Sequence, residues 1–208
     1  ILAVMFLSLW IMPQPAFAGS WSYVGSANIT GSGVQSTSME IVDGTPYVAF
    51  SERNWQTSTD GRAGVVKFDG TNWSFVKSFG SDSNYVTEGS TTEVALTSCG
   101  DVLYIAFNDT TNGIVVKSFD TSDPQAVWET VGSDTAMPKG SKISICVGAS
   151  DDIFVSFRDK SEDNGCVYHF DGTDWAGGVV VPQIGNGYLP IVFVSGTPYM
   201  AYYNKTQY

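Results

Sequence analysis

The chain repeats itself about every fifty residues, and this repeat restricts its fold more than any other feature. Four tryptophans recur, separated by 52, 55 and 47 residues: Trp21, Trp73, Trp128 and Trp175. A second marker keeps the same order, in segments 46–50 (PYVAF), 103–107 (LYIAF), 153–157 (IFVSF) and 198–202 (PYMAY). Periods of this length are typical of arrays of similar supersecondary units. Because two independent markers stay in step, we expect successive units of one kind.

Each unit contains four short strand patterns, which in the first complete unit are 38–42, 47–50, 65–68 and 73–76. They are rich in β-branched and aromatic residues and are bounded by Gly, Asp and Asn, as strands usually are. Asp-Gly pairs such as Asp43-Gly44 favour tight hairpins, because glycine adopts positive φ at little cost. No segment shows sustained helical periodicity. The pattern predicts an all-β fold, a β-propeller of four-stranded antiparallel blades. The tryptophan that starts each fourth strand is expected to pack between blades.

The ends of the repeat suggest how the chain is organised. The segment 21–24 has the pattern of a fourth strand, three full units follow, and a fourth unit stops after its second strand. We therefore expect about 3.5 blades of a larger propeller, occupying residues 19–208 and incomplete at the C-terminus. Residues 1–18 are uncharged, and their apolar run is too short to span a bilayer. Their Ala16-Phe17-Ala18 ending predicts a partial, cleaved signal peptide, and hence a secreted or cell-surface protein.

Composition excludes several classes of protein. The chain has ten Lys and Arg residues and 21 Asp and Glu residues, which gives a net charge of −11. This balance argues against nucleic acid as a partner and against binding to an anionic membrane, because both require clustered cations. After signal cleavage no membrane insertion is expected. Cys99, Cys146 and Cys166 are an odd number at unrelated spacings, which predicts one disulfide at most, or three buried thiols.

Two segments carry a resemblance to a known group. Segments 43–50 (DGTPYVAF) and 65–73 (VVKFDGTNW) resemble the repeats of secreted, mostly bacterial β-propellers of the sialidase-like and kelch-like group, and the resemblance extends over residues 21–208. Segment 161–168 fits the S-x-D-x-G-x-x-aromatic Asp-box of that group. The resemblance implies a propeller, but not one function, because such scaffolds serve as lectins, adhesins, hydrolases and lyases. Sialidases clamp a substrate carboxylate with three arginines, yet no arginine here has the expected Arg-x-Pro context and no Tyr/Glu nucleophile pair is evident.

The expected binding face follows from strand order. In an antiparallel blade, the connections between second and third strands share one face with the crossings between blades, and both are long here. Long loops on a rigid scaffold are where binding residues usually lie. The ligand-binding candidates are the loop aromatics and all the arginines of the chain: Trp55, Tyr85, Tyr188, Arg53, Arg62 and Arg158. We expect the arginines in the connections between second and third strands.

One polar position recurs just after the second strand of each unit, and its members are Glu52, Asp109, Asp159 and Asn204. Such side chains usually accept backbone N–H bonds as the loop turns. The alternative is a ring of oxygen ligands for a cation such as calcium, although no D-x-D-x-D-G loop is present. No other cofactor is expected, and His169, the only histidine, cannot form a metal site by itself.

These observations leave three functions open. The leading interpretation is a secreted, non-catalytic propeller for binding or adhesion, with an extracellular glycan or surface polymer as partner and no catalytic residue assigned. The alternative is the N-terminal part of a propeller glycoside hydrolase of the sialidase-like kind, or of a lyase. The third is a structural domain of a larger surface protein.

Overall fold

The computed structural model describes residues 22–26, 29, 30, 32–54, 59–78, 80–148 and 152–203. The expected signal segment 1–18 lies outside the described residues, as do Trp21, Trp55 and Asn204. None of the described residues lies in a helix. A search of this same part of the chain finds no helix of the length and apolarity needed to cross a membrane.

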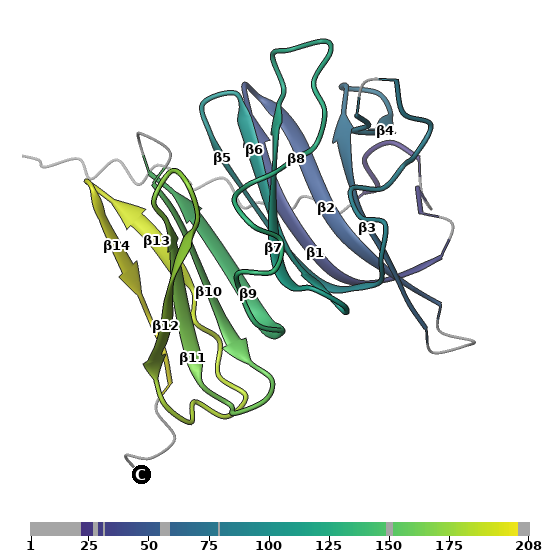
Figure 1. Cartoon of the computed structure of the whole chain (residues 1–208). Helices are drawn as coiled ribbons and strands as arrows, with labels where there is room; N and C mark the ends of the chain where they lie inside the picture. Colours follow the sequence, from purple (N-terminus) through teal and green to yellow (C-terminus); the bar gives the residue numbers. More distant parts are fainter. Residues whose placement is uncertain are drawn as a thin grey trace, which may run out of the picture.

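The described chain forms three four-stranded antiparallel sheets and a two-stranded one, and Figure 1 shows them following one another in chain order. The first contains β1 (Gly33–Val42), β2 (Thr45–Asn54), β3 (Thr59–Phe68) and β4 (Trp73–Phe75). The second contains β5 (Thr91–Cys99), β6 (Val102–Asp109), β7 (Gly113–Asp120) and β8 (Glu129–Thr130). The third contains β9 (Gly140–Val147), β10 (Ile153–Asp159), β11 (Gly165–Phe170) and β12 (Trp175–Val181). The last pairs β13 (Ile191–Val194) with β14 (Thr197–Met200).

This arrangement confirms the predicted propeller of four-stranded antiparallel blades, in which sequential strands pair in order. The turn between β1 and β2 is Asp43-Gly44, with φ values of 44° and 74°, as a tight two-residue hairpin requires. The first two strands of this blade are longer than the sequence predicts. Their added ends, such as 33–37 and 51–54, are mostly polar and carry no alternating apolar pattern. They are held instead by pairing with each other.

The hydrophobic core lies between blades rather than within them. One cluster joins the first two blades and includes Val65 and Leu103, both fully buried. A second joins the second and third blades and includes Ala106 and Val155. A sheet has two faces to bury, so each blade depends on its neighbour for a dry interface. The first strands of successive blades, β1, β5, β9 and β13, contact one another and so line the propeller axis.

The repeated tryptophans connect the blades in a regular way. The indole N–H of Trp73 donates to the carbonyl of Val24 at 2.8 Å, and that of Trp175 donates to the carbonyl of Val131 at 2.7 Å. Trp128 makes the same bond to Val76 at 3.2 Å. Each accepting valine lies three residues after the preceding tryptophan of the repeat. The predicted role of these tryptophans as anchors between blades is confirmed, and Val24 occupies the place of a fourth-strand residue although no strand is assigned at 22–26.

Within each blade the same indole packs on an aromatic residue of the third strand. The ring centroids of Phe68 and Trp73 lie 5.1 Å apart, and those of Phe170 and Trp175 lie 5.4 Å apart. Gly132, at a φ of 68°, makes room for the next indole, since a Cβ there would lie 2.9 Å from Cδ1 of Trp175. Val131 and Gly132, which lie three and four residues after Trp128, therefore form the surface that receives the indole of the next blade.

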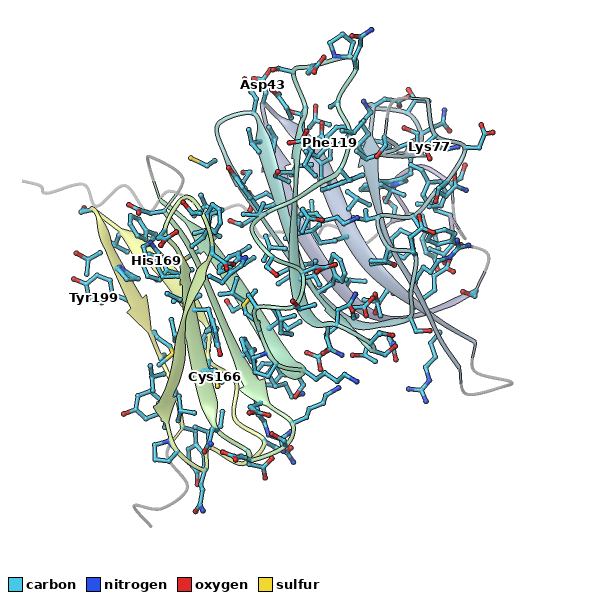
Figure 2. All side chains as sticks on the ribbon, in the orientation of Figure 1. Asp43, Lys77, Phe119, Cys166, His169 and Tyr199 are labelled. Atoms are coloured by element: carbon cyan, nitrogen blue, oxygen red, sulfur yellow. The ribbon has the colours of Figure 1, made fainter. Side chains whose placement is uncertain are left out.

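All three cysteines are free thiols. Cys146 and Cys166 are buried, and burial raises the pKa of each thiol to about 11. Figure 2 places Cys166 and His169 toward opposite ends of β11. His169 stacks on Phe154 with centroids 4.4 Å apart, and its Nε2 lies 3.4 Å from Oδ1 of Asp152. The histidine is thus a packing and turn residue of the third blade.

We expect the Gly132→Ala substitution to destabilise the protein more than Gly100→Ala. Both glycines have positive φ, 68° and 56°, so both substitutions strain the backbone, but a Cβ at Gly100 meets nothing within 4 Å. The clash with Trp175 adds about 1–3 kcal/mol, the usual cost of overpacking. Urea unfolding monitored by fluorescence measures the difference. Equal losses for the two variants would contradict the role assigned to the tryptophan contact.

Stability should fall as the pH rises from 9 toward 11. The two buried thiols titrate at about 11 when folded and near 9.0 when unfolded, so the stability they hold is complete below pH 9 and is lost as they ionise. Urea unfolding of the wild type and of a Cys146→Ala, Cys166→Ala double variant separates this loss, on the order of 2 kcal/mol for each thiol, from tyrosine ionisation. An equally steep fall in the double variant would contradict the assignment.

Candidate functional site

A bulge recurs at the same place in the first strand of each complete blade. The pairing of β1 with β2 shifts between Val34 and Ser36, which leaves Gln35 as an extra residue. The pairing of β5 with β6 shifts between Thr91 and Val94, and that of β9 with β10 shifts between Arg158 and Ser156. A bulge places two residues opposite one and re-aims side chains, and bulges are common beside active sites. Here they turn residues of three neighbouring strands toward one region.

That region is a cavity of about 780 Å³, which we call the axial cavity. Its floor comes from the bulged strands and its rim from β2, the residue after β10 and the crossing before β13. It is lined by Gln35, Ser36, Thr37, Arg53, Thr92, Glu93, Val94, Lys142, Ile143, Lys160 and Tyr188. It therefore lies on the face of the long connections, where the sequence places any binding site.

Side-chain hydrogen bonds tie the floor of the axial cavity together. Ser36 Oγ accepts the N–H of Val94 at 3.2 Å. At the equivalent position of the second blade, Glu93 accepts the N–H of Lys142 through its carboxylate. Lys142 has a φ of 59°, which is uncommon for a residue other than glycine. The carboxylate contact holds this backbone conformation in place, since residues in such regions persist only where their surroundings fix them.

The rim carries the cationic and aromatic groups. Arg53 Nη1 donates to Gln35 Oε1 at 3.3 Å, and Gln35 Nε2 donates to the carbonyl of Thr91 at 3.2 Å. Lys142 Nζ donates to the hydroxyl of Tyr188 at 3.1 Å and lies 4.3 Å from the centroid of its ring. Tyr188 remains 65% exposed. The axial cavity thus combines hydrogen-bond donors with one exposed aromatic ring, and the Lys142 ammonium lies over that ring.

A second cavity of about 640 Å³, which we call the side cavity, lies on the other side of Tyr188. Arg158 and Asp163 form an ion pair at its edge. Tyr203, which is 56% exposed, also lines it. The two cavities share only Tyr188 among their described lining residues.

The structure divides the predicted ligand-binding residues. Arg53 and Tyr188 line the axial cavity, and Arg158 lines the side cavity. The prediction that the arginines lie in loops is wrong, because Arg53 is in β2, Arg62 in β3 and Arg158 in β10. Pairing extends these strands beyond their apolar segments.

Tyr85 and Arg62 belong to neither of these two cavities. The Tyr85 hydroxyl donates to Oε2 of Glu52 at 2.9 Å, and the Arg62 guanidinium lies 4.0 Å from the centre of the tyrosine ring. The pKa of Tyr85 is raised, mainly by burial and further by Glu52. This tyrosine–glutamate pair is not apparent in the sequence, and it ties the connection before β5 to β2.

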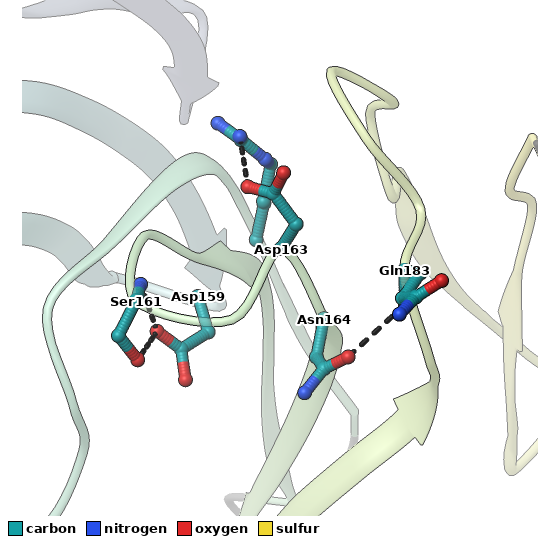
Figure 3. A network of polar contacts seen from close by, with 6 residues as sticks. Asp159, Ser161, Asp163, Asn164 and Gln183 are labelled. Atoms are coloured by element: carbon teal, nitrogen blue, oxygen red, sulfur yellow. Dashed lines mark hydrogen bonds and ion pairs between the residues drawn. The ribbon is translucent and has the colours of Figure 1, made fainter.

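Two members of the recurring polar position, Asp109 and Asp159, hold the turns that follow their strands, whereas Glu52 accepts the Tyr85 hydroxyl. Asp109 Oδ1 accepts the N–H groups of Thr111 and Asn112, both at 2.8 Å. Asp159 Oδ1 accepts the N–H of Ser161 at 2.7 Å, as Figure 3 shows. These are the expected backbone bonds. No group of three or more His, Cys, Asp or Glu side chains suited to a metal ion occurs among the described residues.

The Asp-box-like segment forms the turn between β10 and β11. Asp163 pairs with Arg158, and Asn164 Oδ1 accepts the N–H of Gln183 at 3.0 Å (Figure 3). Asn164 Nδ2 donates to Glu162 at 2.9 Å. The segment thus fixes the loop that separates β12 from the side cavity, and its polar groups are engaged within the protein.

Of the eleven residues that line the axial cavity, only Arg53 and Tyr188 were predicted, and the others include four with long polar side chains: Gln35, Glu93, Lys142 and Lys160. Three of these four, Gln35, Glu93 and Lys142, lie at the bulges, and Glu93 and Lys142 directly precede the first apolar residue of the strand that follows. Aligning the repeats on their first strands would have revealed a shared polar position. Nothing in the sequence shows that the strands bulge there.

No family model and no curated protein matches the chain, but solved structures share its fold. The α-L-arabinofuranosidase PaAbf62A from Podospora anserina, in complex with cellotriose, has a TM-score of 0.50 at 9% identity over 86% of this chain and 66% of that one. A glycoside hydrolase has a TM-score of 0.51 at 15% identity over 82% and 42%. The protein YjhT has a TM-score of 0.50 at 9% identity over 81% and 66%. The chain spans less than two thirds of each. These likenesses place its fold among the β-propellers, glycoside hydrolases included.

We expect Tyr85→Phe to lower the free energy of unfolding by about 1–3 kcal/mol, because it leaves the buried carboxylate of Glu52 without its hydroxyl donor. The same substitution in a Glu52→Gln background should cost less, since an unpaired amide is cheaper to bury than a carboxylate. Urea unfolding of the wild type, the two single variants and the double variant gives the double-mutant cycle that isolates this hydrogen bond. An unchanged stability in Tyr85→Phe would contradict the structural role of this hydrogen bond, and weakened ligand binding in the same variant would support the predicted ligand-binding role of Tyr85.

Proposed function

We propose that this protein is a carbohydrate-active β-propeller that holds a glycan over the axial cavity, as the glycan-holding part of a propeller glycoside hydrolase. The observation that carries the proposal is the lining of that cavity, in which donors and acceptors face one exposed aromatic ring, that of Tyr188. Sugars present hydroxyl groups at their edges and C–H groups on their faces, so this combination suits them. The shared architecture of the two glycoside hydrolases supports the proposal.

Glu93 is the residue of the axial cavity that could take part in hydrolysis. Most glycosidases use two carboxyl groups, one as acid and the other as nucleophile or base. Among the described lining residues Glu93 is the only carboxylate. It is the candidate for one member of such a pair, and we assign no second.

The engagement of Glu93 favours a second candidate function, a non-catalytic glycan-binding or adhesion module. One oxygen of its carboxylate accepts the N–H of Lys142 and so supports the bulge. Under either function we propose a secreted or surface protein, with residues 1–18 as signal and 19–208 as propeller, and an extracellular glycan as partner. A lyase would need the same glycan-holding face.

Calorimetric titration with arabinan, arabinoxylan and cello-oligosaccharides, together with an assay for released reducing ends, tests the proposal. Binding should weaken about tenfold or more in Tyr188→Ala, as expected for an aromatic anchor. It should be unchanged in Tyr199→Ala, a control on β14 with 58% exposure. Glu93→Gln should abolish product release if the chain is catalytic.

The outcomes separate the candidates. Binding without product release from the wild type would support the binding module. If neither these glycans nor charged ones bind or are cleaved, the carbohydrate proposal fails.

A further inference from the structure

We infer that the glycan is a polyuronate, a sugar chain that bears carboxylate groups. The inference rests on the proposed function and concerns the axial cavity. The argument is the excess of cationic side chains in that cavity, because binding a neutral glycan requires hydrogen bonds and aromatic faces but no excess of cations.

The axial cavity is cationic in an acidic protein. Three of the ten Lys and Arg residues of the chain line it, namely Arg53, Lys142 and Lys160, against the single carboxylate of Glu93. The whole chain has a net charge of −11. A concave surface of one sign concentrates the field within it and attracts ligands of the opposite charge. The net charge of the cavity lining is thus positive, opposite to the negative net charge of the whole chain.

The two lysines are available to a ligand. Neither Lys142 nor Lys160 forms an ion pair with a carboxylate in the part of the chain that the structure describes. The Glu93 carboxylate binds the backbone N–H of Lys142 instead of its ammonium group. That ammonium lies against Tyr188, by its hydroxyl and over its ring. The bulge therefore positions the Lys142 ammonium beside the ring of Tyr188. There the ammonium can bind the carboxylate of a sugar while the tyrosine contacts the ring of the same sugar.

The side cavity extends the site beyond one sugar. It adjoins the axial cavity at Tyr188 and carries a second exposed ring, that of Tyr203. Its arginine, Arg158, is already paired with Asp163. Selection for carboxylate thus occurs in the axial cavity, while the side cavity accommodates the continuing chain by contact with tyrosine rings. Two adjoining cavities fit a polymer better than a free sugar acid.

The test compares glycans that share a sugar backbone and differ at the carboxyl group, which is charged in one form and neutral in the other. The probes are oligogalacturonate with its fully methyl-esterified form, and alginate and glucuronoxylan oligosaccharides with their carboxyl-reduced forms. At low salt at least one acidic probe should bind about tenfold tighter than its neutral counterpart, since hydrogen bonds to a charged group are stronger than those to a neutral one. Raising the ionic strength should shrink this advantage.

Charge-removing variants locate the effect. Lys142→Gln and Lys160→Gln should each reduce the preference for the acidic probe over its neutral counterpart several-fold. Lys67→Gln is the matched control, because Lys67 is an exposed lysine of β3 outside both cavities. Circular dichroism of each variant checks that it folds.

Each result bears on one of the two proposals. Equal binding of acidic and neutral members of every pair, or an acidic preference that both cavity variants retain, would overturn the polyuronate inference and leave the glycan proposal standing. Binding of neutral glycans alone would do the same. Failure of every acidic and neutral glycan to bind would reject the proposed function itself.

Discussion

The hydrogen bond from each repeat tryptophan to the carbonyl of the preceding blade is the contact on which the structure depends. It is made by Trp73, Trp128 and Trp175 to valines at one repeat position. Each indole also packs on an aromatic residue of its own blade, as Trp128 does on Phe119 with centroids 4.9 Å apart. One side chain thereby fixes both the outer edge of a blade and its distance from the next. Because the cores lie between blades, this spacing determines how well they pack.

Regular spacing of the blades brings their first strands together at the propeller axis. The first strands of neighbouring blades lie close enough for a side chain of one to accept a backbone hydrogen bond from the next. The hydroxyl oxygen of Ser38 accepts the N–H of Leu96 at 2.9 Å, and that of Ser144 accepts the N–H of Ile191 at 3.2 Å. Where each strand bulges, the same kind of bond is made by Ser36 and by Glu93. The axial cavity is therefore a product of the scaffold: its floor is the place where the regular pairing of three blades is interrupted together.

Most of the fold could be predicted from the sequence, and less of the site. The sequence predicted the blades, the Asp43-Gly44 turn and the tryptophan anchors, because each depends on residues close in the chain or on a repeated pattern. It also identified Arg53 and Tyr188, which line the axial cavity, through residue type and loop length. It misplaced the arginines in loops, since polar strand ends look like loops when their pairing partners are unknown. It did not show that Tyr85 donates its hydroxyl to a glutamate distant in the chain.

Local pattern alone determined the architecture of this protein. A repeat with four alternating strand segments and a tryptophan must bury sheet faces against copies of itself, and a propeller does this. Tertiary structure decided which polar residues meet. Gln35, Glu93 and Lys142 lie on three different blades, and only the stacking of those blades and the bulges in their first strands bring them to one cavity. The physical reason is that a bulge arises from pairing between strands, so its position and the direction of its side chains are not properties of either strand alone.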